Sequence, residues 1–197
     1  MKNIFLSLIE MGYLTLQFPR ELPVYMNRLP NVRILESIVL FMASLSFSTG
    51  IYRMRDYYSP SYLIHISILT SAVYFFLSIY FIFVSSYFDT TVSSKKAIVN
   101  PGKAHQGRSI LYLSSFPFWF FHPAIMLLNA VNAPQLFILP AFLLILFWSI
   151  IIQSRGLQYL YELTWKDFLK NYILSSGIAL IFPIVSVSSL VVLGILS

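Results

Sequence analysis

Glu36 and His122 are ionisable residues inside strongly apolar stretches of this sequence, where they could carry out chemistry. An ionisable group inside a membrane helix is costly, so each is a candidate functional residue. Arg33 lies three positions before Glu36, on the same face of a helix, so one interpretation is an ion pair between them. The alternative is a buried functional carboxylate. His122 is expected to form a hydrogen bond across helices. Glu36 and His122 are therefore our candidates for an intramembrane polar site.

A metal or catalytic centre is not indicated by the remaining chemistry-bearing residues. The three histidines, His65, His105 and His122, lie on different segments, without His-x-x-x-His or Glu-x-x-His spacing. The chain has no cysteine, which excludes disulfides, thiolate metal sites and a cysteine nucleophile. The serines in apolar stretches lack the base and acid that a hydrolase needs, and such serines usually serve helix packing. We therefore predict no catalytic residue, no metal and no cofactor.

The longest polar stretch, residues 89–109, is predicted to be a loop that carries four basic residues. These are Lys95, Lys96, Lys103 and Arg108. The stretch lacks the glycine spacing of a phosphate-binding loop. Basic residues next to a membrane commonly contact anionic lipid headgroups, and docking of an acidic partner is the functional alternative. Nucleic acid is not an expected partner, because no more than two basic residues are adjacent anywhere in the chain.

The composition indicates which elements must position these residues. Of the 197 residues, 58% are hydrophobic and 10% are charged, and the mean hydropathy is +0.77. A soluble domain has roughly 25% charged residues and needs them to stay dispersed. The apolar excess must therefore face lipid. We predict an all-α polytopic membrane helix bundle.

Five apolar stretches predict five transmembrane helices in a membrane domain over residues 34–197. Each is long enough to cross the hydrocarbon core, which takes roughly 20 residues. The predicted spans are approximately 34–52, 62–88, 110–129, 136–153 and 172–196. Pro117 and Pro123 fall in the third span and Pro183 in the fifth. Such prolines are tolerated where neighbouring groups satisfy the freed carbonyl oxygens.

Residues 1–33 are predicted to form a cytoplasmic or interfacial segment before the first span. An amphipathic helix is expected at its start, with its apolar residues on one side. That side carries Phe5, Leu8, Ile9, Gly12 and Leu16. The helix is expected either to lie in the membrane interface or to pack on the cytoplasmic end of the bundle. A cleaved signal peptide is not expected, because Glu10 interrupts the apolar run and no small-residue cleavage site follows.

The distribution of basic residues predicts the orientation. With five spans and a cytoplasmic N-terminus, the cytoplasmic segments are 1–33, 89–109 and 154–171, which hold eleven of the thirteen Lys and Arg residues. Arg53 and Arg55 are the two on the other side. Cytoplasmic loops of membrane proteins are enriched in Lys and Arg. The N-terminus is therefore predicted to be cytoplasmic and the C-terminus outside.

The second half of the chain resembles the Yip domain, a family named for interaction with Ypt/Rab GTPases. The stretch LYLSSFPFWFFHPAIMLL is followed by a short uncharged turn, and a later span ends in WSIIIQSRGLQYLYELTWKDFLKNYILSSGIALIFP. The stretch FPRELPVYMNRLPN also resembles the part that precedes the domain in prokaryotic members. The resemblance covers roughly residues 17–197. The residues that carry it are Tyr112, Pro117, Trp148, Gly156, Leu157, Tyr161 and Pro183.

The resemblance implies five spans with a cytoplasmic N-terminus and a non-enzymatic role in organising membrane or protein complexes. The expected partners are the lipid bilayer, anionic lipid headgroups and other membrane proteins. Only about 33 residues precede the first span, which favours a prokaryotic cytoplasmic membrane over a eukaryotic endomembrane. One alternative is a small transporter or permease subunit that uses the proline-containing third and fifth spans, and another is a lipid-modifying membrane enzyme.

Overall fold

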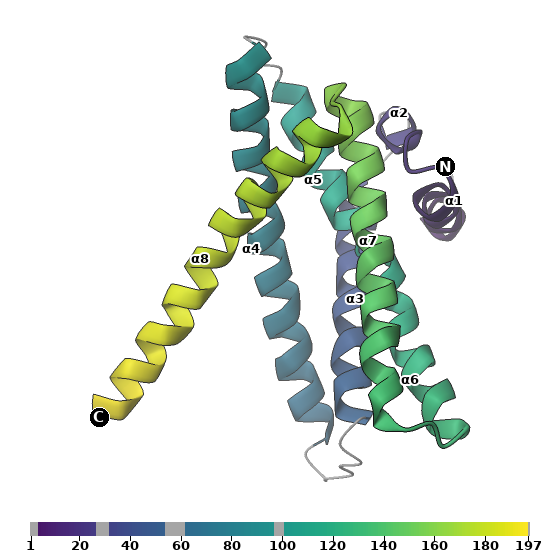
Figure 1. Ribbon diagram of the computed structural model, residues 1–197. Helices are drawn as coiled ribbons and strands as arrows, with labels where there is room; N and C mark the ends of the chain where they lie inside the picture. The colour runs from purple at the N-terminus through teal and green to yellow at the C-terminus, as the bar shows by residue number, and fades with distance from the viewer. Residues whose placement is uncertain (1–3, 27–31, 54–61, 97–100, 197) are drawn as a thin grey trace.

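The computed structural model describes residues 4–26, 32–53, 62–96 and 101–196, and all elements in these ranges are helical (Figure 1). They are α1 (Ile4–Gln17), α2 (Leu22–Met26), α3 (Val32–Arg53), α4 (Tyr62–Lys96), α5 (Pro101–Leu113), the 3-10 helix η1 (Phe116–Phe120), α6 (Phe121–Ala130), the 3-10 helix η2 (Gln135–Phe137), α7 (Ile138–Tyr161) and α8 (Trp165–Leu196). The predicted all-α class is confirmed.

Four helical stretches within the described ranges are long and apolar enough to cross a membrane. They are Val32–Arg53, Tyr62–Val92, Lys103–Ala130 and Ile138–Tyr161, and they correspond to the first four predicted spans. Many large apolar side chains on them point outwards, such as Phe75 on α4 and Phe147 on α7. Lipid can cover these side chains, so the chain has the properties of an integral membrane protein.

The predicted loop over residues 89–109 is wrong for most of its length. Helix α4 continues to Lys96, and α5 begins at Pro101, so only residues 97–100 fall outside the described helices. Proline is favoured in the first turn of a helix, where its missing N–H would have no partner in any case. The polar residues of this segment thus belong to helix ends that extend beyond the apolar part of the bundle, and not to a loop.

The third span is divided into α5, η1 and α6, with Pro117 in η1 and Pro123 in α6. Pro123 cannot donate to the carbonyl of Trp119, and the hydroxyl of Ser46 on α3 donates to that oxygen at 2.9 Å instead. The same hydroxyl oxygen accepts the main-chain N–H of His122 at 3.0 Å. Neighbouring helices therefore satisfy the backbone groups that the break leaves free, as proline in a membrane helix requires.

Two glycines allow helices to approach closely in the centre of the bundle. A Cβ at Gly156 on α7 would lie 2.7 Å from Cγ2 of Ile110 on α5, and one at Gly50 on α3 would lie 2.6 Å from Cδ1 of Phe121 on α6. Small residues at such contacts are typical of membrane helix packing. The α3, α5, α6 and α7 backbones thus form the closely packed part of the molecule.

The N-terminal helix α1 packs against the bundle with only part of the expected apolar side, which includes Leu8 and Gly12. Figure 1 shows α1 end-on beside the long helices, so it runs across their direction. Its buried side carries Ser7, Met11 and Thr15, whereas Phe5 and Ile9 are exposed. Gly12 meets the ring of Phe116 on η1. A helix that presents apolar side chains outwards can pack on the protein and meet lipid at once.

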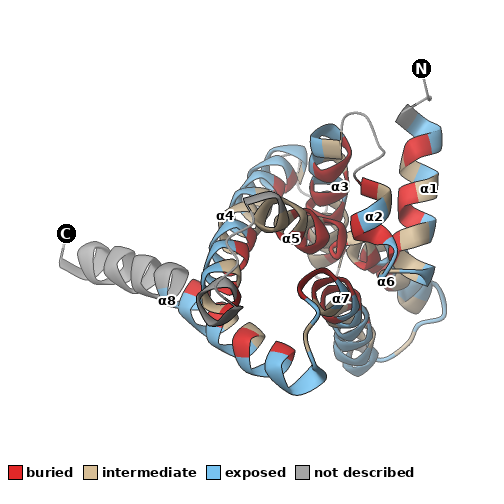
Figure 2. Ribbon diagram, turned by 90° about the horizontal axis from the view of Figure 1, so that it is seen from above, coloured by how far each residue is buried: buried red, intermediate tan, exposed pale blue. Residues whose placement is uncertain are grey.

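Helix α8 is attached mainly through α4 and otherwise diverges from the bundle. Its start is capped by Thr164, whose hydroxyl donates to the Asp167 carboxylate at 2.7 Å and accepts the Asp167 N–H at 3.3 Å. Figure 1 shows α8 crossing α4 and running away from the other helices towards the C-terminus. Seen from above in Figure 2, buried residues line the inner sides of the helices and exposed residues the outer sides.

Candidate polar ligand site

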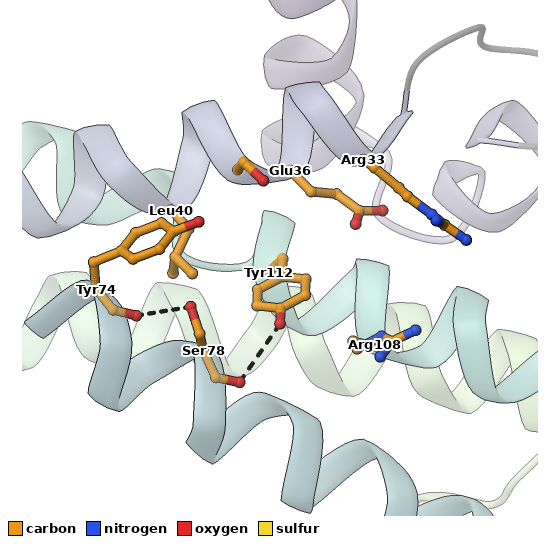
Figure 3. A pocket seen from close by; sticks show the side chains of 8 residues that line it. Arg33, Glu36, Leu40, Tyr74, Ser78, Arg108 and Tyr112 are labelled. Carbon is orange, nitrogen blue, oxygen red and sulfur yellow. Dashed lines mark hydrogen bonds between the residues drawn. The ribbon is translucent and has the colours of Figure 1, made fainter.

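A polar cavity of about 330 Å³ lies between α3, α4 and α5 (Figure 3). Seven of the eight residues that line it have polar or charged side chains. They are Arg33, Glu36, Ser37, Leu40, Tyr74, Ser78, Arg108 and Tyr112. Since Arg33 and Ser37 are exposed, the cavity reaches the surface of the bundle. A cavity of this composition is unusual between apolar membrane helices, which makes it the candidate functional site.

The helix lengths place the cavity near one end of the membrane domain. Glu36 precedes Arg53 by 17 positions on α3, which corresponds to about 25 Å at 1.5 Å per residue. The hydrocarbon core of a bilayer is about 30 Å thick. With Arg53 at one headgroup layer, Glu36 lies just inside the other boundary. The cavity thus lies near the end of α3 that is opposite Arg53.

Glu36 is the buried charged group of this cavity. Its residue is 6% exposed, and its Oε1 atom has no hydrogen-bond partner in the described part of the chain. A buried polar atom without a hydrogen-bond partner destabilises the fold by about 1–3 kcal/mol, and a charged group by more. Beside a polar cavity, such an oxygen can accept a hydrogen bond from water or from a bound ligand.

Arg33 and Arg108 surround the Glu36 carboxylate with positive charge. Both act electrostatically on it, Arg108 more strongly than Arg33. Figure 3 shows Glu36 and Arg33 pointing from α3 towards the side where α5 carries Arg108 and Tyr112. Two guanidinium groups and one carboxylate give the cavity wall a net positive charge, so an anionic group is attracted to it.

Hydroxyl groups complete the wall on the α4 side. The Ser78 hydroxyl donates to the Tyr74 carbonyl at 2.7 Å, and the Tyr112 hydroxyl donates to the Ser78 carbonyl at 3.5 Å. Once its hydrogen is donated, a hydroxyl oxygen still has lone pairs that can accept a hydrogen bond. The Tyr112 ring is held by an edge contact with Phe81, with centroids 5.8 Å apart. The wall thus offers donors from arginine and acceptors from hydroxyl and carboxylate oxygens.

The structure brings together two residues that the sequence had assigned to different sites. Glu36 was predicted for an intramembrane polar site, and Arg108 for contact with headgroups or partners. Both line this cavity. Arg33, which was expected as an ion-pair partner of Glu36, lines it as well. Tyr74, Ser78 and Ser37 were not predicted, because nothing in their own spacing distinguishes them from other polar residues of membrane helices.

The remaining predicted contact residues lie elsewhere. Lys103 lines a second cavity of about 540 Å³ beside Glu162 and Gln106, at the end of the bundle where α5 and α7 meet α2. Its main-chain oxygen accepts the Tyr161 hydroxyl at 3.4 Å. Lys95 and Lys96 end α4, and their side chains lie outside the described residues. Of the four predicted basic residues, the structure thus places Arg108 and Lys103, and they line different cavities.

His122 is not part of the polar cavity. It lies in α6, next to α3, and its main-chain N–H is fixed by Ser46. Its Nδ1 atom is buried and has no hydrogen-bond partner within the described ranges. The permease hypothesis predicted that His122 faces a polar cavity. Instead, Glu36 is the ionisable residue of the two that lines one.

Within the described ranges, no group of three or more His, Asp or Glu side chains is placed to hold a metal ion. His65, by contrast, stacks on Tyr52 with ring centroids 6.1 Å apart. No family model, no curated protein and no solved structure matches this chain.

Proposed function

We propose that the chain is a non-enzymatic multi-pass membrane protein whose working part is the polar cavity between α3, α4 and α5. The observation that carries this proposal is the buried Glu36 carboxylate at the wall of a charged cavity, which interacts with the Ser109 hydroxyl and has one oxygen, Oε1, without a hydrogen-bond partner among the described residues. Ionisable groups inside membrane domains mark binding sites and transport paths. The function would be reversible binding of a polar molecule, as in a small permease or permease subunit.

The proposed topology has five spans, with the N-terminus in the cytoplasm and the C-terminus outside. In support, α8 is 32 residues long, which exceeds the roughly 20 needed to cross. The eleven-to-two division of basic residues supports the cytoplasmic N-terminus. A reporter fused to the C-terminus should be active outside the cytoplasm, and cytoplasmic activity would contradict five spans. The cavity then opens towards the cytoplasmic leaflet, with a prokaryotic cell membrane as the proposed location.

Cysteine accessibility tests the cavity directly, because the chain contains no cysteine. Ser37→Cys and Ser78→Cys place a thiol in the cavity wall, and Ala72→Cys places one on the exposed side of α4 as a matched control. Only a hydrated thiol ionises and reacts quickly with a charged methanethiosulfonate reagent. In inside-out vesicles the cavity thiols should react far faster than the Ala72→Cys thiol. Equal, slow reaction of Ser78→Cys and Ala72→Cys would contradict the proposal.

A second candidate function is the organisation of membrane complexes, as the Yip-domain resemblance implies. The divergence of α8 from α5, α6 and α7 supports it, since exposed apolar residues such as Ile173 and Ile181 remain outside the bundle. Purification from native membranes in mild detergent, with mass spectrometry of the bound proteins, tests this function. A stoichiometric membrane partner would support it, and recovery of the chain alone would count against it.

A further inference from the structure

We infer that the polar cavity binds a phosphoethanolamine group, which is a phosphate joined by a short linker to a primary ammonium. This inference rests on the proposed function and specifies the ligand class of the same site. The observation behind it is the combination of two guanidinium groups with one buried carboxylate around a single cavity. Each of these groups favours a particular chemical group in the ligand.

The charges of the wall favour a ligand that carries charges of both signs. A cation alone would be repelled by Arg33 and Arg108, which line the cavity from α3 and α5. A simple anion would be attracted by the two arginines but would leave Oε1 of Glu36 without a donor. Like charges brought together in a medium of low dielectric constant are strongly unfavourable. A ligand with one anionic and one cationic group can satisfy both parts of the wall.

The arginines favour phosphate as the anionic group. Guanidinium groups match the oxygens of phosphate with two parallel hydrogen bonds, and the two arginines can approach it from different helices. Arg33 is exposed at the rim, whereas Glu36 is buried. The phosphate would thus sit towards the rim and the ammonium further inside. This order agrees with the proposed topology, in which the cavity opens towards the cytoplasmic leaflet.

Glu36 favours a primary ammonium as the cationic group. Its Oε1 atom is buried and lacks a hydrogen-bond donor in the described part of the chain. A primary ammonium has three N–H donors, and a quaternary ammonium has none. The cavity should therefore prefer ethanolamine over choline. Loss of a charged hydrogen bond at a buried site corresponds to about tenfold or more in affinity.

The same group occurs in two sources, the lipid phosphatidylethanolamine and free phosphoethanolamine, and the experiment separates them. The purified full-length protein is mixed with equal amounts of phosphatidylethanolamine, phosphatidylcholine and phosphatidylglycerol of the same acyl chains. Native mass spectrometry then counts the bound lipids. We expect wild type to retain phosphatidylethanolamine about tenfold over either competitor. Free phosphoethanolamine, added in excess, should displace the lipid if the headgroup alone carries the binding.

Variants assign the preference to the cavity. Glu36→Gln should remove the preference for ethanolamine over choline and leave binding of phospholipid as such. Arg108→Gln and Arg33→Gln should weaken binding of both lipids. Arg155→Gln is the matched control, because Arg155 is an exposed arginine outside this cavity. If Glu36→Gln does not fold, Glu36→Asp serves instead, and a shorter carboxylate should retain part of the preference.

The possible results fall into clear classes. Equal retention of the three lipids by wild type, with no free phosphoethanolamine bound in the same spectra, would overturn the ligand class. Binding of free phosphoethanolamine without preferential retention of the lipid would support the ligand class and identify a soluble source. Fast reaction of the Ser78→Cys thiol together with binding of neither form would contradict this inference alone. Slow reaction of that thiol would contradict the proposed cavity itself.

Discussion

Two buried polar regions of this bundle differ in how their hydrogen bonds are completed. Around Gln153, the side-chain amide donates to the Ser114 hydroxyl at 2.9 Å, and its oxygen accepts the Tyr172 hydroxyl. The Ser149 hydroxyl donates to the Ser114 carbonyl at 2.7 Å. These groups fill the space between α7, α8 and the end of α5. Around Glu36, by contrast, there is a cavity and an oxygen without a partner.

The polar groups around Gln153 hold helices together, whereas those around Glu36 are available to a ligand. A network whose donors and acceptors are all paired stabilises one arrangement of helices. A buried carboxylate oxygen without a donor destabilises the folded protein. Proteins keep such destabilising groups where function needs them. Substitutions in the two regions should therefore change stability in opposite directions.

The largest loss of stability is expected at the close contact between α7 and α5. Gly156→Leu would force a side chain into Ile110, which its Cβ alone would approach to 2.7 Å. We expect a loss of about 3 kcal/mol or more, at the upper end of overpacking effects, or no folded protein. Gly177→Leu is the control, since a Cβ there meets nothing within 4 Å. Size-exclusion chromatography after heating in detergent measures both variants, and equal stability would contradict this packing.

A smaller loss is expected in the paired network. Gln153→Leu leaves the Tyr172 hydroxyl and the Ser114 hydroxyl without the amide. The expected cost is about 1–2 kcal/mol, the usual range for a buried hydrogen bond whose partner is left behind. The same heating assay measures it. An unchanged midpoint would show that this network does not stabilise the bundle.

A still smaller loss is expected at the break of the third span. Ser46→Ala removes the donor to the Trp119 carbonyl and the acceptor of the His122 N–H. Hydrogen bonds between membrane helices contribute about 0.6 kcal/mol each on average. We therefore expect a decrease of about 1 kcal/mol for the two. Ser71→Ala on α4, whose hydroxyl bonds only within its own helix at an exposed position, should have no measurable effect.

No loss of stability is expected at the cavity. Glu36→Leu removes a buried carboxylate oxygen that has no hydrogen-bond donor in the described residues, so the midpoint should stay the same or rise. The variant should lose the ethanolamine preference at the same time. A decrease in stability comparable to that of Gln153→Leu would show that Glu36 is a structural group and would remove the contrast between the two regions.

Hydropathy and charge predicted the class of the fold, and they failed where side chains from different helices meet. The first four apolar stretches became helices close to their predicted positions, because apolar residues in sufficient number favour a spanning helix whatever their neighbours. The polar residues from 89 onwards were predicted as a loop, although helix formation does not require apolar residues. Glu36 and Arg108 were identified separately, because 72 positions separate them and only the packing of α3 on α5 brings them to one cavity.

The break in the third span also separates two parts of the span that have different contacts. Helix α5 carries Arg108 and Tyr112 in the cavity wall, and η1 separates it from α6. Since Ser46 fixes the start of α6 to α3, the outer half of this span is anchored independently of the inner half. The break thus divides the work of the span: α5 supplies part of the cavity wall, and α6 fastens the span to α3.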